Sequence, residues 1–160
     1  MRNGRSYQRS SICHSVNSNF ETSLARGAPF LSAGDMTSMY FNQLRQSQPS
    51  CWLYVQKAAQ FAGLSADALQ HALITEYSAG AAIGWHRDRP EFEDVIGISL
   101  RAPCVFRFRR KQGTRWERAS IGLQPRSTYL LRGPARWDWQ HSIPAVDNLR
   151  YSITFRSFRE

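Results

Sequence analysis

The sequence has little of several features that mark other classes of protein. It holds three cysteines in 160 residues, Cys13, Cys51 and Cys104, whose number and spacing match neither a disulfide framework nor a zinc-binding pattern. It has no apolar run long enough to cross a membrane, no signal-peptide core and no internal repeat. These absences predict one monomeric globular domain that works in a reducing cytoplasm, without contact with a membrane.

Acidic side chains are also few. Twelve Asp and Glu residues stand against 21 Lys and Arg residues, nearly all of them Arg, which gives a formal net charge of +9. Such a charge favours partners that carry phosphate, although an Arg-rich balance also arises from genomic base composition. The best local candidate for a phosphate-binding surface is a run of basic residues around a probable turn, for which a solvated hairpin is an equally good explanation. Its members are Arg107, Arg109, Arg110, Lys111, Arg115 and Arg118.

The pattern of the chain changes near residue 48. Residues 1–48 are polar and show no sustained periodicity, which predicts a poorly ordered or divergent N-terminal extension. Residues 49–160 begin with a helical periodicity that Ser50 would cap and Gly63 would end. Ser65 would cap a second, shorter helical turn. We therefore expect one or two helices ahead of the main domain.

Short strands dominate the rest of the sequence. Turn signals such as Lys111-Gln112-Gly113 separate runs of apolar and β-branched residues. So many short strands with regular turns indicate a mainly β sandwich or barrel. The strands that we predict most clearly lie at residues 71–77, 94–100, 104–108 and 127–131.

Two histidines and one aspartate form a candidate metal site. His86 and Asp88 are two residues apart, so on a strand both side chains would point to the same face. His141 would join them from a neighbouring strand. Two imidazoles and one carboxylate on one side of an ion are typical of non-haem Fe(II) oxygenases. A surface hydrogen-bonded pair is the commoner explanation of a His-x-Asp spacing taken alone.

The segment after His141 alternates without a break. Its apolar face carries Tyr151, Ile153 and Phe155, and its polar face carries Arg150, Ser152, Thr154 and Arg156. A guanidinium binds a carboxylate through two parallel hydrogen bonds, so the polar face is suited to a dicarboxylate. Taken alone, the pattern fits the solvent-facing edge of an ordinary sheet better.

Together these motifs resemble the AlkB-like 2-oxoglutarate- and Fe(II)-dependent dioxygenases. The resemblance runs from Leu64 to Arg159 and follows the family's order: Tyr77-Ser78-Ala79-Gly80, Gly84-Trp85-His86-Arg87-Asp88, His141, then Arg150 and Arg156. It implies a double-stranded β-helix (jelly roll) with one or two N-terminal helices packed against it. It also implies that residues 49–160 form the dioxygenase domain, with 1–48 as a reduced lid region.

The resemblance also implies a set of ligands. Fe(II) would be held by His86, Asp88 and His141. The co-substrate 2-oxoglutarate, used together with O2, would be held by Tyr77, by Arg150 at its distal carboxylate, and by Arg156 near the carboxylate that chelates the metal. Thr75 and Ser152 stand where the family often has Asn; they keep a hydroxyl for the co-substrate and lose the amide.

The activity that the resemblance implies is oxidative demethylation of N-alkylated bases in DNA or RNA, with the base single-stranded or flipped out of the stack. Trp85, Trp137 and Trp139 are candidates to contact the base, although core packing explains each of them as well. Arg136 would orient the loop before His141 or touch phosphate. Arg89-Pro90 replaces an acidic residue of some members and leaves base selectivity open.

Two other classes of function stay open at this point. The same iron site would also suit hydroxylation or demethylation of a protein side chain. A non-catalytic nucleic-acid-binding module would keep the fold without turnover. The N-terminal third resembles the family least, and a missing outer strand there would leave a sheet edge unpaired.

Overall fold

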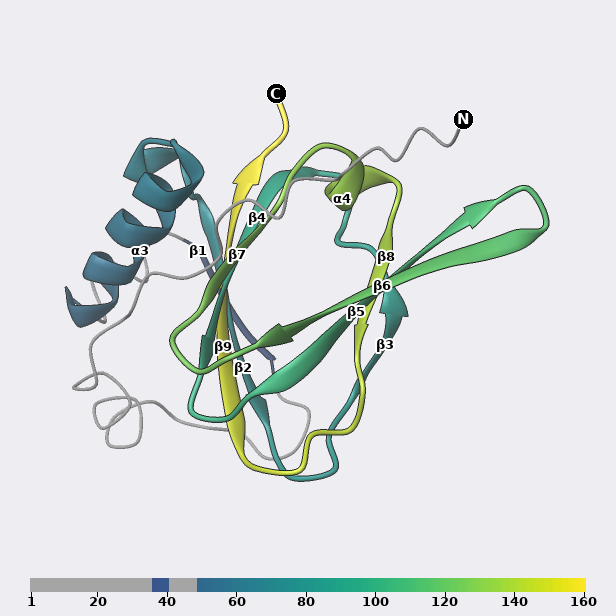
Figure 1. Cartoon of the computed structure of the whole chain (residues 1–160). Helices are drawn as coiled ribbons and strands as arrows, with labels where there is room; N and C mark the ends of the chain where they lie inside the picture. The colour runs from purple at the N-terminus through teal and green to yellow at the C-terminus, as the bar shows by residue number, and fades with distance from the viewer. Residues whose placement is uncertain (1–35, 41–48) are drawn as a thin grey trace, which may run out of the picture.

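Two antiparallel sheets form the body of the protein in our computed structural model, which describes residues 36–40 and 49–160 (Figure 1). The first sheet has the strand order β1-β2-β9-β4-β7, and the second has the order β3-β8-β5-β6. The strands of the first sheet are β1 (Met36–Tyr40), β2 (His71–Tyr77), β9 (Arg150–Phe158), β4 (Phe92–Leu100) and β7 (Thr128–Leu131). Those of the second are β3 (Ile83–His86), β8 (Gln140–Ile143), β5 (Cys104–Gln112) and β6 (Arg115–Leu123). The mainly β jelly roll is as predicted.

Helix α3 (Pro49–Ala62) covers the outside of the first sheet. It begins one residue before the predicted cap at Ser50 and ends where predicted, because Gly63 adopts a φ of 68°. Two closing hydrogen bonds, Gly63 N to Gln60 O at 3.2 Å and Leu64 N to Ala59 O at 2.9 Å, satisfy carbonyls of the last turn. The second predicted helical turn is the 3₁₀ helix η1 (Ala66–Ala68), which follows Ser65 without a bond from its hydroxyl.

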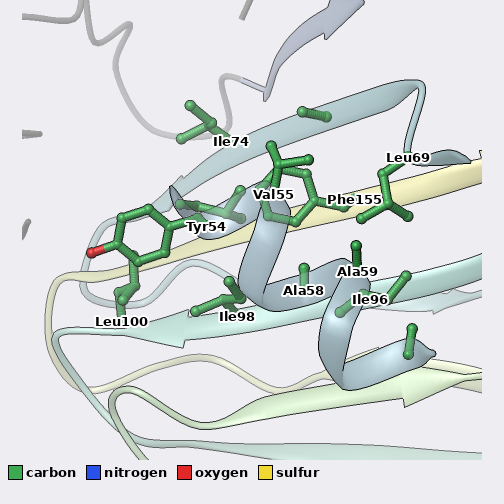
Figure 2. Close-up of a cluster of buried hydrophobic side chains, with 13 residues drawn as sticks. Tyr54, Val55, Ala58, Ala59, Leu69, Ile74, Ile96, Ile98, Leu100 and Phe155 are labelled. Atoms are coloured by element: carbon green, nitrogen blue, oxygen red, sulfur yellow. The ribbon is translucent and has the colours of Figure 1, made fainter. Parts of the chain in front are cut away.

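The apolar face of α3 and the outer face of the sheet make the larger of two cores (Figure 2). Val55 and Ala59 of the helix are buried over Ile96, Ile98 and Phe155 of strands β4 and β9. The small alanines let the helix approach the sheet closely, and the β-branched side chains fit the pleated surface beneath. This packing fixes the outer face of β9, so that the alternate residues of β9 point into the space between the sheets.

A second core fills that space. Its buried members come from both sheets and the connecting loops: Tyr77, Val95, Phe106, Leu123, Leu131, Ile143 and Val146. Strand β9 therefore has cores on both sides, with Ile153 and Phe155 toward α3 and the predicted polar face toward the interior. This explains why Arg150, Ser152 and Arg156 are all buried. The alternative of a solvent-facing sheet edge is wrong for this strand.

Strand β1 lies inside the region that the sequence predicted to be a poorly ordered or divergent extension. It pairs antiparallel with β2, from Met36 opposite Thr75 to Tyr40 opposite His71, and so covers that edge of the first sheet. Its sequence, MTSMY, has no clear alternation. The free backbone groups of β2 supply the pairing that the local pattern does not indicate. The rest of 1–48, with the predicted lid, lies outside the described residues.

The β5–β6 hairpin is longer than predicted. Strand β5 continues to Gln112, past the predicted end at Phe108, and pairs with β6 along its whole length, from Cys104 opposite Leu123 to Gln112 opposite Arg115. The tight turn begins at Gly113, whose φ of 57° suits a two-residue hairpin loop. Basic residues interrupt the apolar pattern in this part of the sequence, so the sequence does not predict the outer half of the hairpin, which only the β5–β6 pairing defines. The turn end of the hairpin extends beyond the rest of the second sheet (Figure 1).

The short helix α4 (Pro134–Trp137) follows β7 and leads into β8. It forms after the Gly133-Pro134 break, where Pro134 occupies the first helical position. Among the described residues, no helix is long and apolar enough to span a membrane.

Gly97 of β4 is a position where only glycine fits. A Cβ atom there would lie 2.1 Å from Cζ of Tyr129, whose ring packs across the strand pair. We expect Gly97→Ala to lower the free energy of unfolding by about 1–3 kcal/mol, the usual cost of overpacking a core, in urea titrations. Gly122→Ala is the matched control, because no atom lies within 4 Å of its Cβ. Equal stability of the two variants would contradict this packing.

Candidate functional site

His86 and His141 face each other across two paired strands. His86 is the last residue of β3, His141 lies in β8, and the two residues are direct partners in the ladder. Their ring centroids are 4.3 Å apart, with the planes at 65°. The prediction that the second histidine comes from a neighbouring strand is therefore confirmed.

Asp88 reaches the same place from a loop. The spacing predicted a strand through His86 and Asp88, but β3 ends at His86 and Asp88 follows it in the connection to β4. Its carboxylate is fixed by Arg156 of β9, whose Nε and Nη2 donate to Oδ1 at 2.9 and 2.7 Å. The other oxygen, Oδ2, lies 3.5 Å from Nε2 of His141. An ion pair from the opposite sheet, and not strand geometry, thus positions this carboxylate.

The charge states of these groups suit metal binding. Burial alone would raise the pKa of Asp88, but the nearby Arg156, with His141, lowers it overall and keeps the carboxylate ionised. Burial, helped by His86, lowers the pKa of His141 to about 4, so its imidazole is neutral at pH 7. A neutral imidazole and an ionised carboxylate are the forms that coordinate a cation.

A hydrogen bond also selects the tautomer of His86. Its Nδ1 lies 2.9 Å from the carbonyl oxygen of Gly84, so Nδ1 carries the proton and donates. That leaves the lone pair of Nε2 available, as in metal-binding histidines whose other nitrogen donates to the protein. The His86 ring is exposed to solvent, whereas the side chains of Asp88 and His141 are largely buried.

A divalent ion fits this donor set in part. Two ligands at right angles, each about 2.1 Å from one ion, lie about 3 Å apart, close to the 3.5 Å between Asp88 Oδ2 and His141 Nε2. In the part of the chain that the structure describes, however, no three His, Cys, Asp or Glu side chains are already gathered as a metal-binding group. The His86 ring lies beside that of His141, but its nitrogen does not complete a group of three metal ligands with Asp88 and His141. The full convergence of the three donors stays a prediction.

Arg136 ties the Asp88 loop to the segment that precedes His141. It lies in α4, is buried, and donates from Nη2 to the carbonyl oxygens of Arg89 and Phe92 at 2.5 and 2.8 Å. Burial lowers its pKa. These bonds fit the first of its two predicted roles, orientation of the loop, and contact with a phosphate stays a prediction.

Arg150 lies at the other end of the interior face of β9. It is 0% exposed, donates from Nη2 to Oγ of Ser99 at 3.1 Å, and stacks over the Tyr77 ring at 4.7 Å. Its Nε and Nη1 are buried and have no hydrogen-bond partner among the residues that the structure describes. A buried charged group without partners is costly, so two unused donors of a guanidinium point to an anion that the protein binds.

Hydroxyl groups surround this guanidinium. Tyr77 lies opposite Arg150 in the β2–β9 ladder, and its hydroxyl is 3.5 Å from Oγ of Ser152. Thr75 is the direct partner of Ser152 and is buried on the same strand as Tyr77. The structure therefore brings together the residues predicted for the co-substrate around Arg150, with Arg156 six residues further along β9 at the metal candidate.

The three candidate tryptophans do not share one position. Trp85 belongs to β3 next to His86, but it packs against Arg107 and Arg109 at 5.3 and 4.5 Å, on the outer face of the second sheet. Trp137 lies beneath Arg136 at 4.4 Å, so its contact is structural. Trp139, two residues before His141, stacks with Arg110 at 4.8 Å. Of the three, Trp139 keeps a position compatible with contact to a base beside the histidines.

Two residues of the Arg150 pocket were not predicted. Ser99 of β4 lies opposite Ser152 of β9 and binds the Arg150 guanidinium. Tyr129 of β7 lies over Gly97, and burial raises the pKa of its hydroxyl. The sequence around each of them predicts only a buried strand. Their place in the site follows from the pairing of β4 with both β7 and β9, which the sequence does not indicate.

Most of the chain matches one known protein family. The model of the 2OG-Fe(II) oxygenase superfamily matches residues 22–156. The chain belongs to the 2OG-Fe(II) oxygenase superfamily. This superfamily uses Fe(II), 2-oxoglutarate and O2, and the motifs found in the sequence make the chain an AlkB-like member.

Individual relatives agree with this membership. The chain is 32% identical over 110 residues to an Arabidopsis thaliana protein named alkylated DNA repair protein ALKBH8 homolog, which covers 57% of this chain and 32% of the relative. It is 29% identical over 109 residues to the mouse mitochondrial alpha-ketoglutarate-dependent dioxygenase alkB homolog 7, covering 62% and 48%. The chain thus spans a third to a half of these relatives.

The fold is shared with a solved bacterial structure. An oxidoreductase of the 2OG-Fe(II) oxygenase family from Burkholderia pseudomallei superposes with a TM-score of 0.61 at 16% identity, covering 89% of this chain and 77% of that one. At this identity the likeness shows the fold alone.

The lowered pKa of His141 predicts how the stability of the metal-free protein depends on pH. Between pH 6.5 and about 4 the unfolded chain binds a proton that the folded His141 does not, so stability should fall as pH falls through this range. His71, whose pKa burial also lowers, should contribute in the same direction. We expect urea titrations with chelator present to show a smaller loss between pH 7 and 5 for His141→Asn than for the unsubstituted chain. An equal loss in both would contradict a neutral, buried His141.

Proposed function

We propose that this protein is an Fe(II)- and 2-oxoglutarate-dependent dioxygenase that demethylates N-alkylated bases in nucleic acid, as in alkylation repair. The observation that carries the proposal is the buried guanidinium of Arg150 with two unused donors, on the same interior strand face as Arg156. An anion-binding pocket and a metal-binding candidate therefore lie along one strand.

The metal would be held by His86, Asp88 and His141. Their charge states support this assignment, since Asp88 is ionised and the Nε2 of His86 is left free by the bond from Nδ1 to Gly84. Arg156 donates to Oδ1 of Asp88, and Oδ2 faces His141. In this role Arg156 keeps the carboxylate in one orientation, so that Oδ2 is the oxygen offered to a cation.

The co-substrate would lie between this candidate and Arg150. Arg150 would bind its distal carboxylate through Nε and Nη1, the two donors without partners. Tyr77, Thr75 and Ser152 line the same side with hydroxyl groups that donate to carboxylate oxygens. Arg156, whose Nε and Nη2 bind Asp88, lies near the metal candidate, where the chelating carboxylate of the co-substrate would lie.

Each residue then has a stated part in the reaction. Iron, when bound with 2-oxoglutarate, supplies the oxidation of an N-methyl group by O2. Arg150 and the hydroxyl groups hold the co-substrate in one orientation, and the Phe106 and Tyr129 rings keep water from its binding pocket. Arg136 holds the Asp88 loop. The exposed side of His86 leaves the site open to a substrate.

Nucleic acid is the substrate that the surface favours. The chain carries a formal charge of +9, and the basic hairpin β5–β6 lies next to β8, which bears His141. Trp139 offers an aromatic ring on the same segment. A relative named as an alkylated DNA repair protein adds support to this substrate class.

Substituting Arg150 should separate co-substrate binding from stability. We expect Arg150→Met to weaken 2-oxoglutarate binding by roughly 2–3 kcal/mol, since a charged hydrogen-bond partner is lost. Stability without ligand should stay equal or rise, because an unpartnered buried charge is removed. Calorimetric titration under anaerobic conditions measures the first and thermal melting the second, with Lys57→Gln on the exposed face of α3 as control. Unchanged 2-oxoglutarate binding would remove the carboxylate assignment.

Turnover tests the substrate class. The protein is loaded anaerobically with Fe(II) and 2-oxoglutarate, then given O2 with N-methylated single-stranded DNA, RNA or a methylated peptide, and formaldehyde and succinate are measured. We expect both products with a nucleic acid, and neither from His86→Ala or Asp88→Asn. Products with the peptide alone would assign a protein substrate. Bound metal with no succinate from any substrate would assign a non-catalytic module.

A further inference from the structure

The outer face of the β3-β8-β5-β6 sheet gathers tryptophan and basic side chains, of which those near the hairpin turn are exposed. Phe106 and Phe108 of β5 face the interior, where Phe106 packs against His141, so the alternate residues of β5 face outward. Their partners in the β5–β6 ladder share that face. We name this surface the Trp–Arg face. It consists of Trp85 from β3, Arg107, Arg109 and Lys111 from β5, and Trp116 and Arg118 from β6.

Two arginines on this face have guanidiniums that are fixed by hydrogen bonds to β8. Arg109 lies between two tryptophans, 4.5 Å from the Trp85 ring and 4.4 Å from the Trp116 ring, and its Nε donates to Oε1 of Gln140 at 2.8 Å. Arg107 donates from Nε to Oγ of Ser142 at 3.2 Å. Both guanidiniums are thus anchored through Nε, which leaves their terminal nitrogens available. An oriented fork of this kind loses little entropy when it binds a phosphate.

The described residues do not neutralise the charge on the Trp–Arg face. Within the described ranges 36–40 and 49–160, no carboxylate forms an ion pair with Arg107, Arg109, Lys111 or Arg118. The one acidic residue of the hairpin, Glu117, alternates to the opposite face and binds Arg110 at 2.6 Å. The positive charge is therefore free for an anionic partner.

We infer that the Trp–Arg face binds the backbone and bases of a single-stranded nucleic acid on its way to the site. Aromatic rings on which bases stack, interleaved with cations that contact phosphates, are what sequence-tolerant binding of single strands requires. Trp116 is 41% exposed, so part of its ring is open to a stacking base. A duplex keeps its bases stacked inside and would leave these rings unused.

The edge strand β3 connects this face to the candidate metal site. Trp85 and His86 are consecutive, with Trp85 on the outer face and His86 beside His141 on the inner one. With strands about 4.8 Å apart, the distance from β6 to β3 is about 14 Å, enough for a short run of nucleotides. A strand lying from Trp116 to Trp85 would then pass around the edge of β3 and present its next base at His86. This inference rests on the proposed nucleic-acid function, but it does not depend on turnover.

Binding of an unmodified oligonucleotide tests the Trp–Arg face. The full chain, without iron, is titrated against a fluorescein-labelled single strand of mixed sequence at several salt concentrations. We expect Lys111→Gln/Arg118→Gln to reduce the slope of log K against log salt by about 1 to 2, roughly one for each phosphate contact removed. Trp116→Ala should weaken binding by about ten-fold, and Trp116→Phe should restore most of it. Lys57→Gln/Arg126→Asn removes two exposed cations elsewhere and should leave the slope closer to that of the unsubstituted chain.

Four outcomes would overturn the inference. They are hairpin variants that bind like the control variant, a duplex that binds as tightly as the single strand, polyglutamate that competes as well as the oligonucleotide, and no loss with Trp116→Ala. Thermal melting shows whether each variant is folded. Because the titration uses no iron and no methylated base, failure of demethylation with intact hairpin-dependent binding would reject the proposed activity and keep this surface. If the Lys111/Arg118 and Trp116 variants demethylate as well as the unsubstituted chain, the proposed activity is kept and this surface is rejected.

Discussion

The ion pair between Asp88 and Arg156 joins the two halves of the candidate site. Asp88 follows a strand of one sheet, and Arg156 lies on the central strand of the other. Two hydrogen bonds to a single carboxylate oxygen hold a loop residue at a fixed place beside His141. Because the pair is buried, removal of either partner would leave an uncompensated charge. The position of the candidate metal ligand therefore depends on the closure of the two sheets around β9.

The neighbouring Arg150 illustrates the opposite arrangement. Its guanidinium is buried like that of Arg156, yet two of its nitrogens have no hydrogen-bond partner within the described part of the chain. A fold optimised for stability alone would place an apolar side chain at this position. Strand β9 thus carries one cation that is paired with a carboxylate and one that has two unused donors, and this difference separates the metal candidate from the proposed co-substrate pocket.

Much of this site follows from the sequence. The uninterrupted alternation of residues 150–156 indicates which side chains share a face, and the spacing of His86, Asp88 and His141 indicates the kind of chemistry. The strand at 71–77 and the end of the first helix at Gly63 are also local properties, because a period of two and a glycine with positive φ need no distant partner. The family motifs lie in these same segments.

Other features required the tertiary structure. Asp88 is outside the strand predicted for it, and an arginine of the other sheet fixes its place; Ser99 joins the Arg150 pocket only through the pairing of β4 with β9. Strands β1 and β6 have sequences without a strand pattern and form because a neighbour offers free backbone groups. The sequence by itself determined the chemical types at the site and the faces of its strands. Only the tertiary structure decided which groups meet, because pairing between distant strands and burial between sheets are not encoded in any one segment.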